Sequence, residues 1–528
     1  MAWRRLRASR GGNVGVRYFR TTVGTISTVV MLAVVLGGAQ APQAPAAGGP
    51  GGNDSRAALW SALDGDKDGA VTRAEMRGAF EKWYEATDTA RTGSVATDQL
   101  GPALNAALGL PAPVPGAGGG RGGAAPAGPG APTCGGRGNL PTVGQTPCPD
   151  DVTKMMAALP ATAPARPAKA RKILVLGNVR GYVHGSIPLA AKTIEELGKK
   201  TGAWTTTITY DPADINTKNL EQYDALFLSS TTGCFLDAKT TEPPASKADV
   251  EARQAALLAF VRGGKGLGGI HATGDSYHSP CANDPGFGAG RGGGGRGGNA
   301  NGAGGTLASV ILRWSWGVNE KKLQAGDLTL TKADMGAVSD AMFEQLDTEK
   351  AGKVSQANFT TRIVPLVTQT NQYVGTAGRD TGKGSWMDWD NMIGGWFKFH
   401  WLDPQKITVK IDDKSSALTK MFSGQDFDVN DETYTFSINS FSRKNVHVLT
   451  SINYDKMSFM DKLKESNPRP DHDFGLSWIK KDGQGRVFYM ALGHNERIYA
   501  MKPMLEHMLA GMQYALGDLK ADDSPSQK

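Results

Sequence analysis

The sequence contains few cysteines, four in 528 residues, and no two of them form a C-x-x-C pair. This scarcity argues against a thioredoxin-like redox motif and against a zinc ribbon, since both need closely spaced thiols. A small set of cysteines is typical of disulfides in an oxidising compartment. Cys134–Cys148 is the first pairing that we expect, and a Cys234–Cys281 pair and unpaired thiols are the alternatives.

Net positive charge is almost absent once the first 20 residues are set aside. The formal net charge is +7, but residues 1–20 hold six arginines and no acid, which leaves +7 − 6 = +1 for the rest. A nucleic-acid-binding protein carries its positive field in its folded part. We therefore expect no nucleic-acid partner.

The chain also lacks a long hydrophobic run. The apolar centre of the N-terminal segment, Val29–Leu36, is shorter than the ~20 residues of a membrane-spanning helix. It follows the arginines and precedes Ala39-Gln40-Ala41, so residues 1–46 have the features of an export signal. We expect a periplasmic or extracellular protein. If the segment is not cleaved, residues 21–40 anchor the protein in a membrane.

Glycine, by contrast, is abundant, with 69 residues that gather in a few stretches. Residues 111–168 are rich in Pro, Gly and Ala and are predicted to be a linker, because this composition buries too little apolar surface to fold. A second Gly-rich run, 284–306, opens an insert that extends to residue 386 and has helical periodicity over 307–370. Residues 521–528 are a predicted tail.

Short apolar runs alternate with helical segments on both sides of this insert. The predicted strands are 173–176, 204–210, 225–229, 266–271, 396–401, 407–411, 446–452 and 486–492. The predicted helices between and after them are 187–199, 247–261 and 504–516. The alternation predicts one interrupted α/β domain, 169–283 and 387–520, whose mostly parallel sheet has helices on both faces.

Residues 64–75 match the calcium-loop pattern D-x-D-x-D-G-x5-E at every constrained position. Aspartates at alternate positions offer hard oxygen ligands, Gly69 permits the sharp turn, and a glutamate closes the coordination sphere with both oxygens. The predicted Ca²⁺ ligands are Asp64, Asp66, Asp68, Ala70 through its carbonyl, Thr72 and Glu75. Helical flanks make residues 53–110 a predicted all-α EF-hand pair.

The partner loops of this motif are degenerate. Residues 88–99 have the length, the glycine and the apolar eighth residue of a loop, but Ala90 and Gln99 replace two ligands, so we expect a structural partner that rarely binds Ca²⁺. In the insert, residues 347–358 keep acids at positions 1 and 3, and 327–334 resemble the second half of a further loop. We expect the insert to be a second, degenerate EF-hand pair, for which calcium binding stays open.

Four of the eight histidines lie near predicted strand ends, where α/β enzymes place reactive groups. They are His184, His271, His400 and His494, and the acids best placed to join them are Asp275, Asp431 and Glu432. Any one of these histidines alone would more often be structural. Their common placement predicts a shared site.

Four motifs around these residues resemble the ThuA-like (trehalose-utilisation) family: GYVHGSI at 181–187, GGIHATGDS at 268–276, DETY at 431–434 and GRVFYMALGH at 485–494. The resemblance covers about 171–281 and 387–518. It implies a flavodoxin-like fold related to class I glutamine amidotransferases, and a role in carbohydrate utilisation. It also implies that His271 stands where those enzymes have a nucleophilic cysteine, so we expect no Cys-dependent amidotransferase activity.

The predicted site is therefore a pocket of imidazoles and carboxylates. In one interpretation, His184, His271 and His494 bind Zn²⁺ or a similar ion that activates water or polarises a sugar carbonyl. In another, His271 and Asp275 form a metal-free acid/base pair that acts on a sugar or keto-sugar, with Glu432 close by. Cys234 is a rival nucleophile.

A non-catalytic, calcium-stabilised protein that binds a saccharide or another partner is the alternative function. Aromatic side chains near the strand ends could stack on a small carbohydrate ligand or could simply pack in the core. They are Tyr182, Trp396, Trp401, Tyr434 and Trp478.

Overall fold

The computed structural model describes residues 59–100, 144–282, 307–370 and 384–526, apart from 97–98, 241, 279, 326, 328 and 466–467. The predicted export signal, residues 111–143 of the predicted linker, and the Gly-rich run 284–306 lie outside the described residues. Within the described part, no helix has the length and apolar character needed to cross a membrane.

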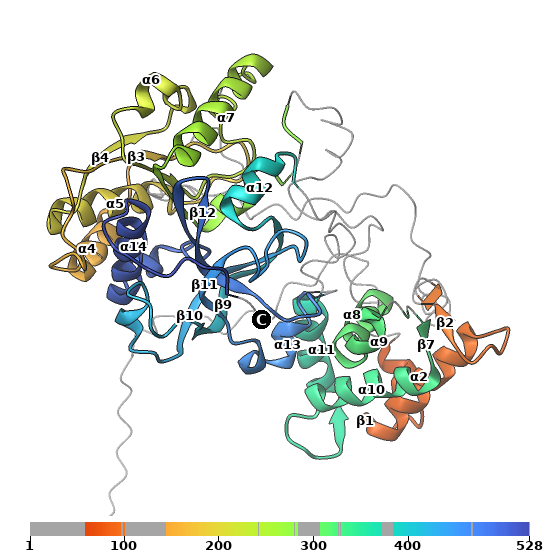
Figure 1. The fold of residues 1–528 in the computed structure, drawn as a ribbon. Helices are drawn as coiled ribbons and strands as arrows, with labels where there is room; N and C mark the ends of the chain where they lie inside the picture. The colour runs from red at the N-terminus through yellow and green to blue at the C-terminus, as the bar shows by residue number, and fades with distance from the viewer. Residues whose placement is uncertain are drawn as a thin grey trace, which may run out of the picture. The chain divides into compact units, whose positions relative to one another are not determined.

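A nine-stranded sheet in the order β10-β9-β11-β12-β13-β6-β5-β3-β4 forms the centre of the α/β domain (Figure 1). Its strands are β3 (Lys172–Leu176), β4 (Thr205–Thr209), β5 (Ala225–Ser229), β6 (Gly266–Ile270), β9 (Phe397–Ile411), β10 (Phe427–Phe436), β11 (His447–Ile452), β12 (Gly475–Asp482) and β13 (Gly485–Met490). The pairings from β4 to β13 are parallel, and those from β13 to β10 are antiparallel. The parallel sheet that the sequence predicts is present, and antiparallel strands extend it.

The parallel strands follow the flavodoxin-like order. Numbered along the chain as β3, β4, β5, β6 and β13, they lie in the sheet as 2-1-3-4-5. Buried apolar residues fill β3 and β5, as expected for strands that are covered on both faces. The carboxyl ends of β3, β6 and β13 thus share one edge of the sheet.

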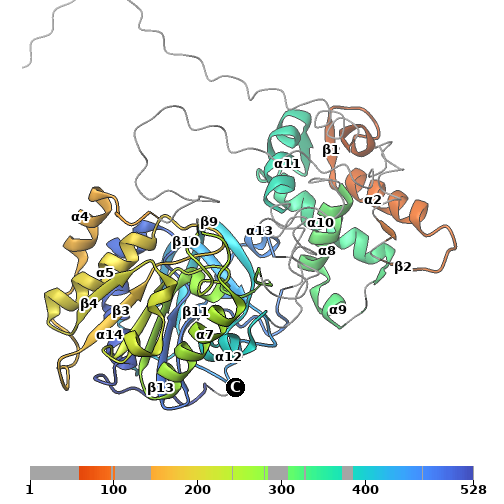
Figure 2. The same ribbon diagram turned by 90° about the horizontal axis from the view of Figure 1, so that it is seen from above.

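Helices cover both faces of this sheet (Figure 2). One face carries α4 (Pro149–Ala158), α5 (Ile187–Thr201) and α14 (Lys502–Ala515), and the other carries α7 (Lys247–Arg262), with α6 (Thr217–Leu220) packed on it, and α12 (Met387–Ile393). Two successive glycines of β6 point to opposite faces of the sheet. A Cβ atom added at Gly268 would contact Met512 of α14, whereas one added at Gly269 would contact Ile393 of α12. Short helices lie among the loops: η1 (Pro212–Asp214), η2 (His271–Asp275), η3 (Lys420–Phe422), η4 (Tyr454–Lys456), α13 (Phe459–Lys462) and η5 (Glu496–Ala500).

The prediction of a linker over 111–168 is wrong for its last part. Helix α4 lies in this range and packs Met155 and Leu159 into the core of the α/β domain. Pro149 and two acids at the start of α4 favour a helix N-terminus there, although the surrounding sequence is rich in proline and alanine. The α/β domain therefore begins before residue 169.

A second apolar core lies in what we call the helical lobe, residues 59–100 and 307–370. It contains a helical stretch over 59–63, β1 (Ala70–Thr72), α2 (Arg73–Thr87), β2 (Val95–Ala96), α8 (Leu307–Val318), α9 (Glu320–Gln324), β7 (Thr329–Leu330), α10 (Lys332–Leu346), β8 (Lys353–Ser355) and α11 (Gln356–Thr370). The helical periodicity predicted for the insert is confirmed. The pairing of its loops is different from the expectation, since β1 pairs with β8 and β2 pairs with β7.

The two segments of the helical lobe share one apolar core. Met76 and Phe80 of α2 belong to the same buried cluster as Met335, Val338 and Phe343 of α10. Figure 1 shows the orange N-terminal segment among the green helices of the insert. The lobe is therefore built jointly by stretches of chain more than 200 residues apart.

Candidate metal centres

The end of β6 positions His271. The buried run Gly266–Ile270 lies between β5 and β13, and η2 begins immediately after it. His271 has a φ of +46°, a left-handed conformation that costs a non-glycine residue on the order of 1–3 kcal/mol and is concentrated at functional sites. Its Nδ1 lies 2.8 Å from the carbonyl oxygen of Ala491. Because a carbonyl can only accept, Nδ1–H donates, and Nε2 keeps its lone pair.

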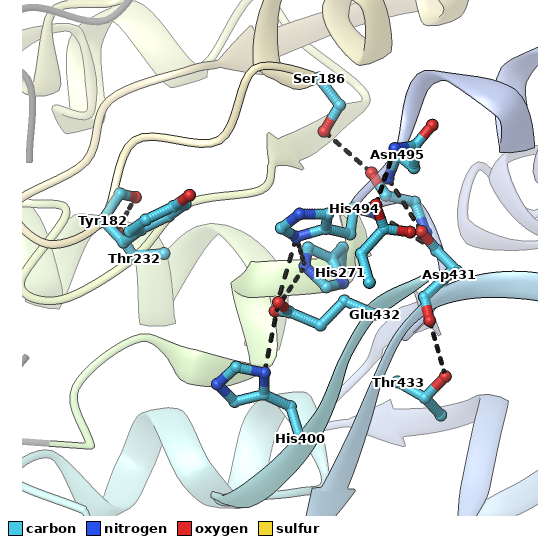
Figure 3. Close-up of polar contacts among 12 residues, drawn as sticks. Tyr182, Ser186, Thr232, His271, His400, Asp431, Glu432, Thr433, His494 and Asn495 are labelled. Atoms are coloured by element: carbon cyan, nitrogen blue, oxygen red, sulfur yellow. Dashed lines mark hydrogen bonds and ion pairs between the residues drawn. The ribbon is translucent and has the colours of Figure 1, made fainter. Parts of the chain in front are cut away.

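The end of β13 positions His494, and the buried carboxylate of Asp431 holds this turn. It accepts hydrogen bonds from the backbone N–H groups of Gly493, His494 and Asn495 at 2.7, 3.2 and 2.9 Å (Figure 3). Burial raises the pKa of Asp431 to about 7, while His271 and these N–H groups act in the opposite direction. The imidazole of His494 is held with Nδ1 at 3.2 Å from Nε2 of His271.

His184 comes from the loop between β3 and α5. Ser186 ties this loop to the end of β13, because its hydroxyl donates to the carbonyl oxygen of Gly493 at 2.9 Å. The ring centroid of His184 lies 4.9 Å from that of His271 and 5.1 Å from that of His494. Its Nδ1 is buried and has no hydrogen-bond partner among the described residues. Burial and the neighbouring imidazoles hold the pKa of His184 well below its usual value, so the ring is neutral, as a metal ligand must be.

Glu432 brings a carboxylate from β10 to the three imidazoles. Its Oε1 lies 3.6 Å from Nε2 of His271 and 3.5 Å from Nδ1 of His494, and its Oε2 lies 3.2 Å from Nδ1 of His400. Burial alone would raise the pKa of Glu432, but these histidines hold it well below its usual value. The carboxylate is therefore charged.

These four side chains have the geometry of a metal site. His184, His271, Glu432 and His494 are all buried, and each offers one donor atom, all of which lie within 4.8 Å of one another. A tetrahedral ion with bonds of about 2.0–2.1 Å holds its donor atoms roughly 3.3 Å apart. The separations of 3.2, 3.5 and 3.6 Å among His271, His494 and Glu432 are close to that value. Imidazole and carboxylate donors suit Zn²⁺ and similar transition ions.

The structure does not bring Asp275 to the ring of His271, as the metal-free interpretation requires. Oδ1 of Asp275 lies 2.6 Å from Nδ1 of His278, and the acid beside His271 is Glu432. Burial alone would lower the pKa of His278, but Asp275 raises it to about 9. Sequence analysis missed His278, for which the only available signal was its place three residues after Asp275.

One of the aromatic candidates for sugar stacking is exposed. Tyr182 has 38% of its surface accessible, and its ring centroid lies 4.9 Å from that of His184. Trp396, Trp401, Tyr434 and Trp478 are all buried. Tyr434 packs on the ring of His271, with 4.4 Å between centroids, and has a structural role beside the cluster.

The described cysteines contribute no nucleophile to this cluster. Cys234 forms a disulfide with Cys281, with a Cα–Cα distance of 5.7 Å, which excludes the interpretation of Cys234 as a rival nucleophile. The bond joins the segment after β5 to the segment after η2. The pairing Cys134–Cys148 stays a prediction, since Cys134 lies outside the described residues.

The predicted calcium loop gathers its three aspartates. Donor oxygens of Asp64, Asp66 and Asp68 lie within 4.8 Å of one another, and Gly69 has the positive φ, +84°, that the sharp turn requires. Asp64 is 6% exposed, and its Oδ1 has no hydrogen-bond partner among the described residues. Glu75 caps α2 by accepting from the N–H and the hydroxyl of Thr72 at 2.9 and 2.8 Å. Ala70 lies in β1, which fixes its backbone.

The degenerate loops use their first aspartate differently. Asp88 accepts from the backbone N–H groups of Thr92 and Gly93 at 2.8 and 2.9 Å. Asp347 accepts in the same way from Ala351 and Gly352 at 2.9 and 2.8 Å. In both loops the two carboxylate oxygens bond the loop's own backbone, whereas Oδ1 of Asp64 has no such bond.

Comparison with known proteins gives a family. The model of the ThuA family, described as trehalose utilisation, matches residues 172–289 and 323–515, more than half of the chain. The first matched segment contains His184 and His271, and the second contains Glu432 and His494. No curated protein matches the chain.

Solved structures with similarity to the chain include two that are described as ThuA-like. One, from Bacteroides uniformis, is 15% identical over 69% of this chain and 99% of its own, with a TM-score of 0.37. The other, from Parabacteroides merdae, is 11% identical over 67% and 93%, with a TM-score of 0.33. A cytoplasmic protein from Salmonella typhimurium is 8% identical over 67% and 100%, with a TM-score of 0.29. The family assignment rests on the family match and not on these scores.

Proposed function

Because the chain belongs to the ThuA (trehalose utilisation) family, we propose that it is an exported enzyme that processes a sugar or keto-sugar. Its reaction centre is a transition-metal ion, such as Zn²⁺, bound by His184, His271, His494 and Glu432. The observation that carries this proposal is the convergence of four buried donor atoms within 4.8 Å. The Cys234–Cys281 disulfide supports the exported location, because such bonds persist in oxidising compartments.

The residues of the cluster have separate tasks in this proposal. An ion bound there supplies Lewis-acid chemistry, which lowers the pKa of water or polarises a carbonyl oxygen. The hydrogen bond from Nδ1 of His271 to Ala491 fixes the tautomer that leaves Nε2 as the donor. His400 holds Oε2 of Glu432, and Asp431 holds the turn that carries His494. The exposed ring of Tyr182 offers a stacking surface to a sugar.

Elemental analysis of the purified protein tests the metal centre. We expect about one transition-metal ion per chain, which a strong chelator removes and added Zn²⁺ restores. His271→Asn should lower this content to near zero without unfolding the chain, because asparagine tolerates the positive φ at this position. His447→Gln is the matched control, since His447 contacts Asp413 outside the cluster. Full metal content in His271→Asn would contradict the ligand assignment.

Calcium binding at residues 64–75 is the second function that we propose, as part of an EF-hand-like lobe. The buried Oδ1 of Asp64, without a partner among the described residues and beside two more aspartates, supports it. Exported calcium modules bind Ca²⁺ with a Kd of about 10⁻⁴–10⁻³ M. Where calcium outside the cytosol reaches or exceeds this range, the loop would be largely occupied and would have a structural role.

Isothermal titration with Ca²⁺ tests this second function. Glu75→Gln removes the bidentate ligand. The Ca²⁺ affinity should therefore fall by more than the ~10–100-fold that is typical when a residue that only hydrogen-bonds to a metal ligand is lost. The circular dichroism of the α/β domain should stay unchanged. Unaltered binding in Glu75→Gln would refute its role as a ligand.

A further inference from the structure

We propose that Ca²⁺ in loop 64–75 controls the docking of residues 59–100 on the insert 307–370. This inference rests on the calcium binding proposed above and extends it. The partner of the calcium loop is a distant segment of the same chain. Binding of Ca²⁺ and docking of residues 59–100 are therefore thermodynamically linked.

Each structural element that surrounds loop 64–75 is held by the insert. Before the loop, the ring of Trp60 packs edge-on against Phe359 of α11, with 5.2 Å between centroids. Within the loop, β1 pairs antiparallel with β8, where Val71 lies opposite Val354. After the loop, Arg77 of α2 lies 3.1 Å from Asp340 of α10.

The neighbouring loop is held in the same way. Val95 of β2 lies opposite Leu330 of β7, so both N-terminal loops pair with the insert and not with each other. Lys332, at the start of α10, adds ion pairs to Glu81 and Glu85 of α2, at 3.2 and 2.8 Å. Such exposed pairs contribute little, about 0–1 kcal/mol each, and the shared apolar core is the main stabilising term.

The geometry of the calcium ligands depends on these contacts. The β1–β8 pairing fixes the backbone of Ala70, whose carbonyl is a predicted ligand, and the N–H of Gln356 in the insert donates to the carbonyl oxygen of Gly69 at 3.2 Å. The same loop gathers the carboxylates of Asp64, Asp66 and Asp68. Without a cation, the charges of these three carboxylates repel one another. A free N-terminal segment lacks the β1–β8 pairing that fixes the backbone of this loop, so Ca²⁺ binds the docked form more tightly.

Reciprocity then sets the effect of calcium on docking. If docking strengthens Ca²⁺ binding, then Ca²⁺ must strengthen docking by the same factor. When free Ca²⁺ is 100 times its Kd and the undocked segment does not bind it, the docking equilibrium shifts by about 100-fold. Residual binding by the undocked segment lowers this factor, and we expect a shift of at least tenfold.

A cleavable full-length chain tests the linkage. A protease recognition sequence is placed within residues 115–130, between the two parts of the helical lobe, and the folded protein is cut there. Only non-covalent contacts then hold the N-terminal fragment. We expect the dissociation constant of the fragment, measured by size-exclusion chromatography over a dilution series, to rise at least tenfold when EGTA replaces Ca²⁺. If the fragment stays bound at every dilution, the urea concentration of half-release must fall on chelation.

Matched variants separate the ligand effect from a general effect on charge. Asp64→Asn and Glu75→Gln should abolish the difference between Ca²⁺ and EGTA. Lys67→Asn changes a charge in the same loop at a position with no predicted ligand, and its positive φ suits asparagine, so the difference should persist. In the uncut chain, Val354→Ala touches no ligand but weakens the β1–β8 contact, and it should lower Ca²⁺ affinity.

The outcomes distinguish this inference from the calcium site itself. Absence of Ca²⁺ binding by the uncut protein would overturn the proposed site and the linkage with it. Normal Ca²⁺ binding, together with a fragment whose release is the same in Ca²⁺ and EGTA, would overturn the linkage alone. Unchanged Ca²⁺ affinity in Val354→Ala would also count against the linkage.

Discussion

The carboxylate of Glu432 has a different environment at each oxygen. Oε1 faces Nε2 of His271 and Nδ1 of His494, and Oε2 faces His400. Oε1 is therefore available to an ion, while His400 holds Oε2 in place. In the proposed metal centre, this division lets a single buried acid act as a ligand while it stays fixed in orientation.

The three histidines of the cluster could be predicted from the sequence, and Glu432 was one of three candidate acids that the sequence could not rank. His184, His271 and His494 each follow a parallel strand, so topology alone brings them to one edge. The metal-free interpretation pairs His271 with Asp275, which is four residues away in the sequence. The η2 turn brings its carboxylate to His278 instead, and residue spacing does not show this.

The pair of Asp275 and His278 gives a prediction about pH. The pKa of His278 is about 9 in the folded protein, above the ordinary value of about 6.5 in an unfolded chain. Its stabilising contribution is therefore fully present below pH 6.5 and is lost as the pH rises through 9. His278→Gln should lower the free energy of unfolding more at pH 6 than at pH 10, as measured by urea denaturation. An equal loss at both values would contradict the charged pair.

At the scale of elements, the turn after β13 depends on one side chain from β10. Asp431→Ala would leave the buried N–H groups of Gly493 and His494, and the half-buried N–H of Asn495, without their acceptor, at ~1–3 kcal/mol for each buried group. We expect a loss of about 3 kcal/mol or more in the free energy of unfolding, measured with chelator present so that metal binding does not contribute. Asp431→Asn keeps one acceptor oxygen and should cost less. If the two variants are equally stable, the carboxylate does not hold this turn.

The strands of the antiparallel half were the least predictable elements. Strand β10 contains the polar run 430–433, and the buried acids in this run serve the cluster, so no continuous apolar alternation marks the strand. Strand β9 joins the predicted strands 396–401 and 407–411 through Pro404, which in a sequence indicates a break. In contrast, the buried runs of β3 and β5 were predictable, because strands covered on both faces are continuously apolar.

At the scale of the whole molecule, the partners of the EF-hand-like loops could not be deduced. All four have an apolar residue at the paired position, namely Val71, Val95, Leu330 and Val354. Any two such loops can pair, and nearness in sequence favours the local partner. The shared core decides in favour of the distant one, because α2 and α10 bury their apolar faces against each other.

This arrangement predicts the result of deleting the insert. The chain leaves and re-enters the α/β domain at one place, since Ser385 donates to the carbonyl oxygen of Tyr277 at 2.7 Å, so residues 284–383 can be replaced by a short linker. That deletion alone would expose Met76 and Phe80, and we expect aggregation in size-exclusion chromatography. Removal of residues 54–143 as well, with Leu463→Gln to replace the apolar side chain that the lobe covers, should give a soluble α/β domain with a cooperative thermal transition. A soluble monomer from the single deletion would contradict the shared core.

The shared core also has a consequence for synthesis. Residue 100 leaves the ribosome 307 − 100 = 207 residues before α8 begins, roughly 10–40 s at ~5–20 residues per second. For that interval Phe80 and Trp83 face water or a chaperone. The order of translation thus makes residues 59–100, which are synthesised before the α/β domain, among the last to reach their final neighbours.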